Sequence, residues 1–136
     1  MRFITKLLLT VFFNFIVLKI YSIDMPKDLI VKIIKESEDQ DDTKSKNLDL
    51  ISVKYTGWIF DSNASTNNYC EAKGKMFDSN IFDTFHHTIP FQFVLGKGVV
   101  IKGWDLGLQD MRIDEKRCLV IPPHLAYGNR RIGNII

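Results

Sequence analysis

With 136 residues, of which 46% are apolar and 25% are charged, the chain has the composition of one globular domain with a single core. Its net charge of +2 and the lack of a basic stripe in the sequence argue against a nucleic-acid-binding protein. The two cysteines, Cys70 and Cys118, are neither a disulfide framework nor a metal set, and the sequence leaves open whether they pair.

Residues 1–22 have the pattern of a secretory signal peptide. Arg2 and Lys6 supply positive charge, and the apolar run Leu7–Leu18 is shorter than the roughly 20 residues that a transmembrane helix needs. We therefore expect an exported protein in an oxidising compartment, where the two cysteines could form a disulfide. The alternative is an uncleaved segment that anchors the protein in a membrane.

The next part of the chain predicts two strands separated by a loop. The apolar run Leu29–Ile34 is typical of a first strand. Glu36–Asn47 is acidic and then basic, and it predicts a solvated loop because the ligand spacing of an EF-hand calcium site is missing from it. Apolar and polar residues alternate over Ile51–Thr56, which predicts a half-buried strand that Trp58–Phe60 continues.

A polar stretch then interrupts the strand pattern. Asp61–Lys75 is rich in Asn, Ser, Thr and Gly, and it predicts a surface loop with a formal glycosylation sequon at Asn63. Strand character returns at Met76–Asp78. His86 and His87 would point to opposite faces of an extended segment and have no partner at metal-site spacing, so we expect solvated histidines and no metal.

A short helix is the centre of the remaining sequence. It opens at Lys102, and one of its faces is formed by Trp104, Leu108 and Met111. Asp105 lies in its first turn, where a carboxylate meets the positive end of the helix dipole. The predicted strand before the helix has one apolar face, formed by Phe91, Phe93 and Leu95. In the predicted strand after the helix, Arg117–Ile121, successive side chains alternate between the two faces. We expect the helix to lie on a sheet, with Trp104 at the base of the space between them.

Aromatic residues from separate predicted elements form the main chemical signal: Tyr55, Phe77, Phe91, Phe93, Trp104 and Tyr127. The alternative is that they are ordinary core residues. However, the polar atoms of Tyr and Trp need partners when buried, which favours positions at the edge of an apolar volume. An apolar pocket with few polar groups is typical of a small-ligand site. No nucleophile elbow, phosphate loop or carboxylate pair stands out in the sequence, so we expect no cofactor.

Five segments, in this order, resemble the FKBP-type peptidyl-prolyl isomerases: Val53–Gly57 (VKYTG), Met76–Ser79 (MFDS), Pro90–Phe93 (PFQF), Val100–Asp105 (VIKGWD) and Ala126–Gly128 (AYG). The resemblance implies an α+β fold, in which a strongly bent antiparallel β-sheet wraps around one short α-helix. It also implies three regions, namely a signal peptide or anchor (1–22), an N-terminal strand with a charged loop (23–47), and the isomerase domain (48–136).

The same resemblance implies an isomerase that accelerates X–Pro isomerisation during the folding of secretory proteins, without acid–base or covalent chemistry. Its implied partners are proline-containing polypeptides and macrolide inhibitors. The implied location is the endoplasmic reticulum lumen, with secretion or the periplasm as alternatives. By motif, the catalytic residues would be Tyr55, Phe77, Asp78, Trp104 and Tyr127, and the substrate-binding residues would be Phe91, Phe93, Val100, Ile101 and Ile136.

The family pattern continues past Ile136 into a closing strand. The resemblance therefore implies that the last strand is missing and that the chain ending here is not a competent isomerase by itself. A non-catalytic binding or chaperone module and an inactive truncated fragment are the alternatives to an active enzyme.

Overall fold

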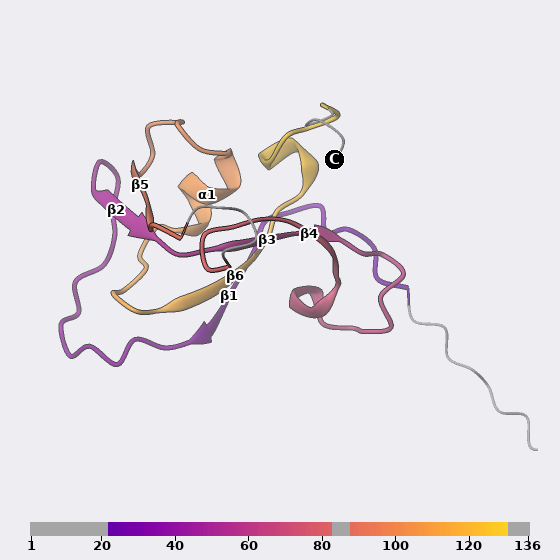
Figure 1. Cartoon of the computed structure of the whole chain (residues 1–136), viewed down its shortest axis with the longest axis horizontal. Coiled ribbons are helices and arrows are strands. Elements are labelled where there is room, and N and C mark those ends of the chain that lie inside the picture. The colour runs from indigo at the N-terminus through magenta and orange to yellow at the C-terminus, as the bar shows by residue number, and fades with distance from the viewer. Residues whose placement is uncertain (1–21, 83–87, 131–136) are drawn as a thin grey trace, which may run out of the picture.

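A computed structural model of the chain describes residues 22–82 and 88–130 (Figure 1). In chain order these residues form β1 (Ile30–Lys35), β2 (Leu50–Val53), β3 (Thr56–Phe60), η1 (Tyr69–Glu71), β4 (Lys73–Ser79), β5 (Phe91–Val94), α1 (Lys102–Gly107), β6 (Lys116–Val120) and η3 (Pro123–Leu125). Most of the predicted signal segment, both predicted loop histidines and Ile136 lie outside the described residues. No helix in the described ranges is long and apolar enough to cross a membrane.

The strands pair in three antiparallel ladders, β1 with β6, β2 with β5, and β3 with β4. Figure 1 shows these ladders as an open, curved arrangement with α1 lying against it. The predicted α+β class, with antiparallel strands around one short helix, is confirmed. Within the described ranges the ladders are separate, and each has two strands.

The single strand predicted at Ile51–Thr56 is split in two. β2 ends at Val53 and β3 begins at Thr56, because the first half pairs with β5 and the second half pairs with β4. Within β2 the predicted alternation of exposed and half-buried side chains is confirmed. The break between the two strands leaves Tyr55 at the junction of two ladders.

The core lies between α1 and the strands β2, β5 and β6. Phe93, Leu95 and Leu108 form its buried centre. Half-buried apolar side chains pack around this centre: Ile51, Val53, Val100, Trp104, Met111 and Leu119. Gly103 lets the helix approach β6 closely, because a Cβ at this position would overlap the Ile121 side chain. The apolar faces predicted for the helix and for the strand at Phe93 therefore pack against each other.

Arg117, on β6, holds the C-terminal end of α1. Its guanidinium donates to the carbonyl oxygens of Gly107 at 3.0 Å, Gln109 at 2.6 Å and Asp110 at 2.7 Å. It also forms an ion pair with Glu115, and the exposed fractions of the two side chains are 9% and 3%. The last carbonyls of a helix have no partner within the helix, and a cation there opposes the negative end of the helix dipole. Arg117 therefore satisfies the end of this short helix.

The segment between β3 and β4 is more structured than the predicted surface loop over Asp61–Lys75. β4 already begins at Lys73, because the residues from there on pair with β3. Before β4, the Asn68 side chain caps η1 by accepting a hydrogen bond from the Cys70 N–H at 3.1 Å. Cys70 and Cys118 form a disulfide that ties η1 to β6. This is the pairing that the sequence left open.

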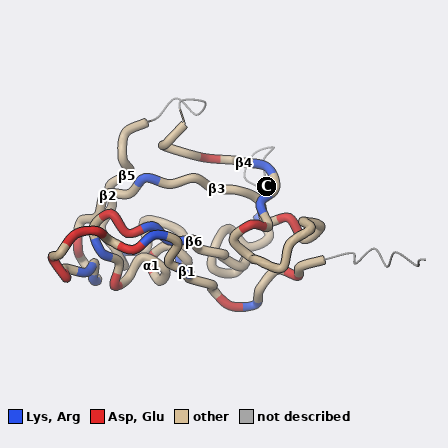
Figure 2. Tube along the Cα trace, turned by 90° about the horizontal axis from the view of Figure 1, so that it is seen from below, with Lys and Arg blue, Asp and Glu red and all other residues tan. Residues whose placement is uncertain are grey.

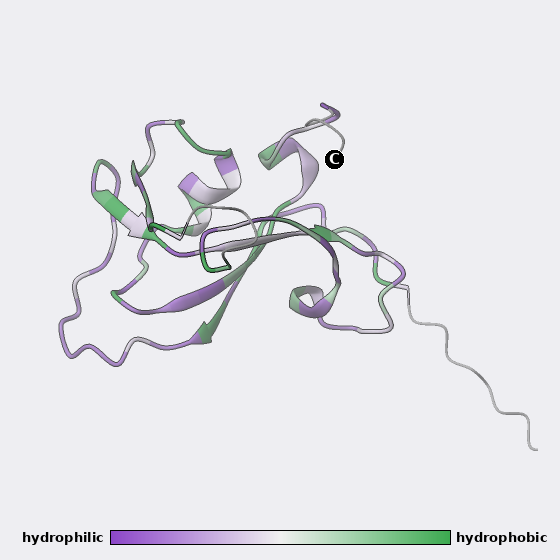
Figure 3. Cartoon of the chain, viewed as in Figure 1, coloured by the Kyte–Doolittle hydropathy of each residue, from purple (hydrophilic) through white to green (hydrophobic). Residues whose placement is uncertain are grey.

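Charges of both signs gather in the segment between β1 and β2 (Figure 2). Figure 3 shows the same segment as a hydrophilic loop at the edge of the molecule. The carboxylates of Asp39 and Asp41 accept backbone N–H groups two residues further along the chain. Near its end the loop contacts the segment after α1, through a bridge between Lys44 and Arg112 and through hydrogen bonds between Ser45 and Leu108, Asp110 and Met111. The predicted solvated loop is confirmed.

Candidate active site

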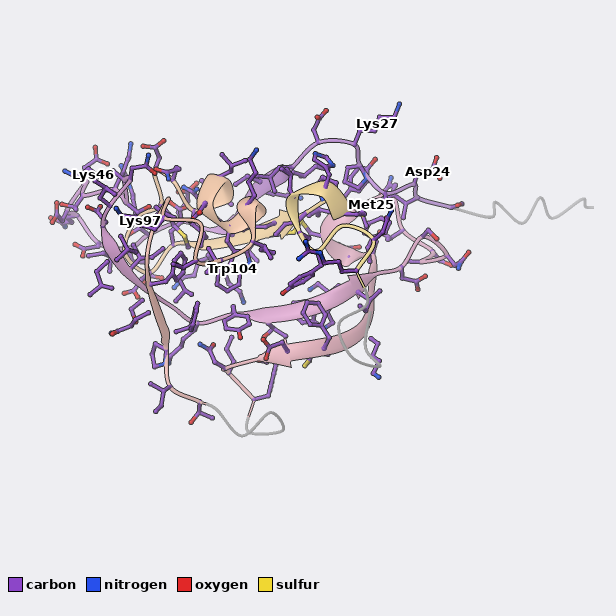
Figure 4. The ribbon with its side chains drawn as sticks, turned by 90° about the horizontal axis from the view of Figure 1, so that it is seen from above. Asp24, Met25, Lys27, Lys46, Lys97 and Trp104 are labelled. Carbon is purple, nitrogen blue, oxygen red and sulfur yellow. A yellow bond between two sulfur atoms is a disulfide. The ribbon has the colours of Figure 1, made fainter. Side chains whose placement is uncertain are left out.

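Trp104 is the centre of four aromatic side chains, Tyr55, Phe91, Phe93 and Trp104, which we call the aromatic cluster. The Trp104 ring centroid lies 5.0 Å from that of Tyr55, 5.8 Å from that of Phe93 and 6.2 Å from that of Phe91. Two of these contacts are edge-on, at interplanar angles of 77° and 69°, which is a geometry that aromatic quadrupoles favour. Figure 4 shows Trp104 between α1 and the strands β3 and β4.

The aromatic cluster runs from the core to the surface. Phe91 and Phe93 lie two residues apart on β5, so they share one face of the strand and stack at 5.5 Å. Phe93 is 5% exposed and belongs to the core, whereas Phe91 is 43% exposed. The cluster is therefore closed at one end and open to solvent at the other. An apolar group from outside can reach its open end.

Tyr55 brings a polar group to this apolar cluster. Its hydroxyl donates a hydrogen bond to Oδ2 of Asp78 at 2.6 Å. Burial, followed by the hydrogen bond to Asp78 and the negative charge of that residue, raises the pKa of the Tyr55 phenol well above its ordinary value, and Tyr127 adds to the increase. The phenol is therefore protonated at neutral pH and fixed in direction. It acts as an oriented dipole at the cluster and not as a base.

Phe77, the residue before Asp78 on β4, packs against β3. Its ring covers Gly57 on β3, since a Cβ added to Gly57 would lie 2.7 Å from Cζ of Phe77. Within the described ranges the ring contacts of Trp104 come from the other cluster members and not from Phe77. The structure therefore places the Phe77 ring over Gly57, where β3 and β4 pair.

The remaining predicted site residues surround Trp104. Val100 packs against the core. The Ile101 carbonyl accepts the N–H groups of Trp104 at 2.9 Å and Asp105 at 3.4 Å, which starts the helix. The Ile101 N–H makes no hydrogen bond to another described residue. Tyr127, after η3, is 37% exposed. Ile136 lies outside the described residues, so its binding of substrate stays a prediction.

Two supporting residues were not recognised as such from the sequence. The sequence predicts that Asp105 opposes the helix dipole. In the structure its carboxylate also accepts the N–H groups of Gly96 at 2.7 Å and Gly98 at 2.9 Å, and so ties the turn after β5 to α1. Asn80 is 2% exposed, and its side chain joins several backbone segments. The sequence carries no periodic or motif signal for Asn80, because its partners are backbone groups distant in the chain.

The site consists of an apolar, partly exposed cluster with one oriented phenol–carboxylate pair. In the part of the chain that the structure describes, no group of three or more His, Cys, Asp or Glu residues could hold a metal ion. The arrangement is suited to binding a compact apolar group and orienting the polar backbone next to it.

The sequence is similar to those of known proteins. A family model described as FKBP-type peptidyl-prolyl cis-trans isomerase matches residues 41–136. A protein named FK506-binding protein 2B from Rhizopus delemar is 45% identical over 93 residues, which are 68% of this chain and 37% of its own length. A protein named FK506-binding protein 2 from Kluyveromyces lactis is 38% identical over 136 residues, covering 100% of this chain and 83% of that one.

The similarity to solved structures is weaker. A structure titled as a peptidyl prolyl cis-trans isomerase from Mycobacterium tuberculosis aligns with 79% of this chain and 71% of its own, at 34% identity and a TM-score of 0.40, so the superposition carries no argument. The chain spans 37% of the length of the Rhizopus relative.

Proposed function

The chain belongs to the FKBP-type peptidyl-prolyl cis-trans isomerase family, and we propose that its aromatic cluster accelerates the cis–trans isomerisation of X–Pro peptide bonds. The observation that carries the proposal is the position of Trp104, whose ring has three aromatic neighbours within 6.2 Å. One of these, Phe91, is exposed. A prolyl ring is a compact apolar group that fits against such a surface.

This reaction needs no proton transfer and no covalent intermediate. The barrier of about 18–20 kcal/mol arises because resonance stabilises the planar peptide bond. For X–Pro bonds the uncatalysed reaction takes tens to hundreds of seconds. In the rotated transition state the resonance is lost, so the imide carries less charge separation than in the planar form. An apolar site therefore favours the rotated form over the planar one, and the aromatic cluster supplies such surroundings.

Polar groups around the aromatic cluster would orient the substrate backbone. The Ile101 N–H, which has no partner within the described residues, and the hydroxyl of the exposed Tyr127 would donate to carbonyls that flank the proline. The Tyr55 phenol, which donates to Asp78, would provide an oriented polar group at one side of the aromatic cluster. Orientation of this kind lowers the entropic part of a barrier. Phe77 would border the site from the β4 side.

The cellular role that we propose is assistance to folding in the secretory pathway, in the endoplasmic reticulum lumen. The expected signal peptide supports this role, as does the Cys70–Cys118 disulfide, because disulfides persist mainly in oxidising compartments. The substrates would be proline-containing polypeptides. The relatives are named for binding FK506, and we propose that this chain binds the same macrolide at the aromatic cluster.

A refolding reaction limited by proline isomerisation tests the proposed activity. Against the expectation that the chain ending at Ile136 is not competent by itself, we propose that the purified protein accelerates this reaction and that FK506 abolishes the acceleration. A protein that shows neither effect would instead support the alternative of an inactive fragment. Replacing Trp104 by Leu should reduce both acceleration and FK506 affinity at least about tenfold, which corresponds to roughly 1.4 kcal/mol.

Trp58→Leu is the matched control. Trp58 is also a tryptophan, but it lies on β3 under the Lys73 ammonium group, which is 4.4 Å from its ring centroid. Its removal should leave both readouts unchanged. Binding of FK506 without acceleration would identify a non-catalytic binding module. Equal losses in the two variants would contradict the assignment of Trp104 to the site.

A further inference from the structure

Asn80 is the first residue after β4, and both polar atoms of its side chain are hydrogen-bonded. Its Oδ1 accepts the Tyr55 N–H at 2.8 Å, and its Nδ2 donates to the carbonyl of Val53 at 2.9 Å and to that of Ile89 at 3.2 Å. Only this orientation of the carboxamide matches its acceptor to a donor and its two donors to acceptors. With 2% of the residue exposed, water cannot replace these partners.

The partners of Asn80 belong to different parts of the fold. Val53 is the last residue of β2, and Ile89 lies just before β5, so these two contacts hold the end of the β2–β5 ladder. Asn80 itself follows β4, which pairs with β3. One buried carboxamide therefore joins the two ladders at the point where the chain passes from β2 to β3.

Tyr55 lies at this junction and is held on both sides of its backbone. Its N–H donates to the Asn80 side chain, and its carbonyl accepts the Asn80 N–H at 3.2 Å and the hydroxyl of Ser79 at 3.1 Å. A backbone fixed in this way sets the direction of the Tyr55 side chain. That direction places the Tyr55 ring 6.5 Å from Phe91 and its hydroxyl on Asp78.

We propose that Asn80 is the positioning residue of this site: its carboxamide fixes the distance between Tyr55 and Phe91 and thereby the width of the open end of the aromatic cluster. The proposal rests on the function proposed above. Asn80 touches no substrate itself. It acts through the backbone of Tyr55 on one side and through the backbone of Ile89, close to Phe91, on the other.

The test uses Asn80→Ser in the whole protein, with Asn68→Ser as the matched control. Asn68 caps η1 and bonds Glu71, so its replacement removes side-chain hydrogen bonds of another asparagine away from the aromatic cluster. Two readouts are compared in protein that circular dichroism shows to be folded. The first is acceleration of proline-limited refolding, and the second is the nuclear Overhauser contact between the Tyr55 and Phe91 rings.

We expect Asn80→Ser to lose acceleration at least about tenfold and to weaken the contact between the Tyr55 and Phe91 rings, since small misplacements in a site have large effects on rate. The control should lose stability but keep both readouts. A variant that melts earlier than the parent but retains full acceleration and the ring contact would overturn the proposal. An inactive parent that does not bind FK506 would refute the proposed function instead, whereas the ring contact would still test the positioning.

If Asn80→Ser does not fold, Asn80→Asp supplies a second variant of the same shape. It keeps the acceptor for the Tyr55 N–H. However, its second carboxylate oxygen would face the carbonyl oxygens of Val53 and Ile89, to which the carboxamide of the parent donates. Acceleration by this variant should rise as the pH is lowered and the carboxyl group becomes protonated, because a protonated carboxyl can donate one hydrogen bond. The parent should show no such rise. Parallel pH profiles of variant and parent would overturn the proposal.

Discussion

Around α1 the chain is held by buried apolar side chains, whereas the β3–β4 hairpin is held by a disulfide, polar networks and surface contacts. The helix rests on Phe93, Leu95 and Leu108. On the hairpin side, Phe60 stacks on Tyr69 at 6.4 Å near the surface, and the disulfide supplies the connection to β6. The aromatic cluster takes residues from the first region and from the junction between the two. The site therefore depends on both kinds of stabilisation.

The largest effect on stability is expected at the buried ion pair next to α1, between Arg117 and Glu115. Arg117→Met should lower the free energy of unfolding by about 3–5 kcal/mol, because it leaves Glu115 buried without its partner and frees the carbonyls after α1. Urea denaturation measures the loss. Arg112→Met is the control, since its ion pair with Asp42 is exposed and worth about 0–1 kcal/mol. Similar losses in both variants would contradict the buried role of Arg117.

Removal of the disulfide should affect the hairpin region selectively. The double variant Cys70→Ser with Cys118→Ser should lose about 2–4 kcal/mol of stability. Hydrogen exchange should accelerate in residues 61–72 and remain slow in β5 and α1, because those elements belong to the apolar core. Uniform acceleration across both regions would show that the disulfide stabilises the whole domain and would remove the contrast between the regions.

A smaller effect is expected where the two regions meet at Phe77. Gly57→Ala places a methyl group against the Phe77 ring and should cost about 1–3 kcal/mol through overpacking. Combining it with Phe77→Leu should recover part of this loss, since the two residues are in direct contact. Thermal melts of the single and double variants measure this coupling. Strictly additive effects would show that the ring does not rest on Gly57.

The smallest effect concerns pH. Because folding raises the pKa of Tyr55, the folded protein keeps this phenol protonated while the unfolded chain ionises above about pH 10. The stabilisation is therefore complete below about pH 10 and is lost as the pH rises further. Tyr55→Phe lacks this dependence, so its unfolding free energy should fall less steeply between pH 9 and 11 in urea titrations. Parallel curves for parent and variant would contradict the raised pKa.

The helix region could be predicted from the sequence because its signals are local. The spacing of Trp104, Leu108 and Met111 and the alternation around Phe93 predicted faces that do pack together. The family resemblance predicted a set of site residues, and four of these residues form the aromatic cluster. The roles of these residues in catalysis and binding, including those of Phe77 and Tyr127, stay predictions.

The hairpin region could not be predicted in the same way. The start of β4 at Lys73 and the break at Tyr55 depend on which strand pairs with which, and this is a long-range property. The disulfide was left open for the same reason. The role of Asn80 could not be predicted either, because a buried carboxamide that bonds to backbone carbonyls produces no periodic pattern in a single sequence.

The disulfide also closes the polypeptide into a covalent ring. Its cysteines are 48 residues apart, and the ring they close contains Phe91, Phe93 and Trp104 but leaves Tyr55 on the incoming strand. A protease that cuts once inside this ring, for example at the exposed Lys97, therefore leaves every part of the aromatic cluster attached to one molecule. Within the ring, two cuts, or one cut followed by reduction, are needed to release a piece.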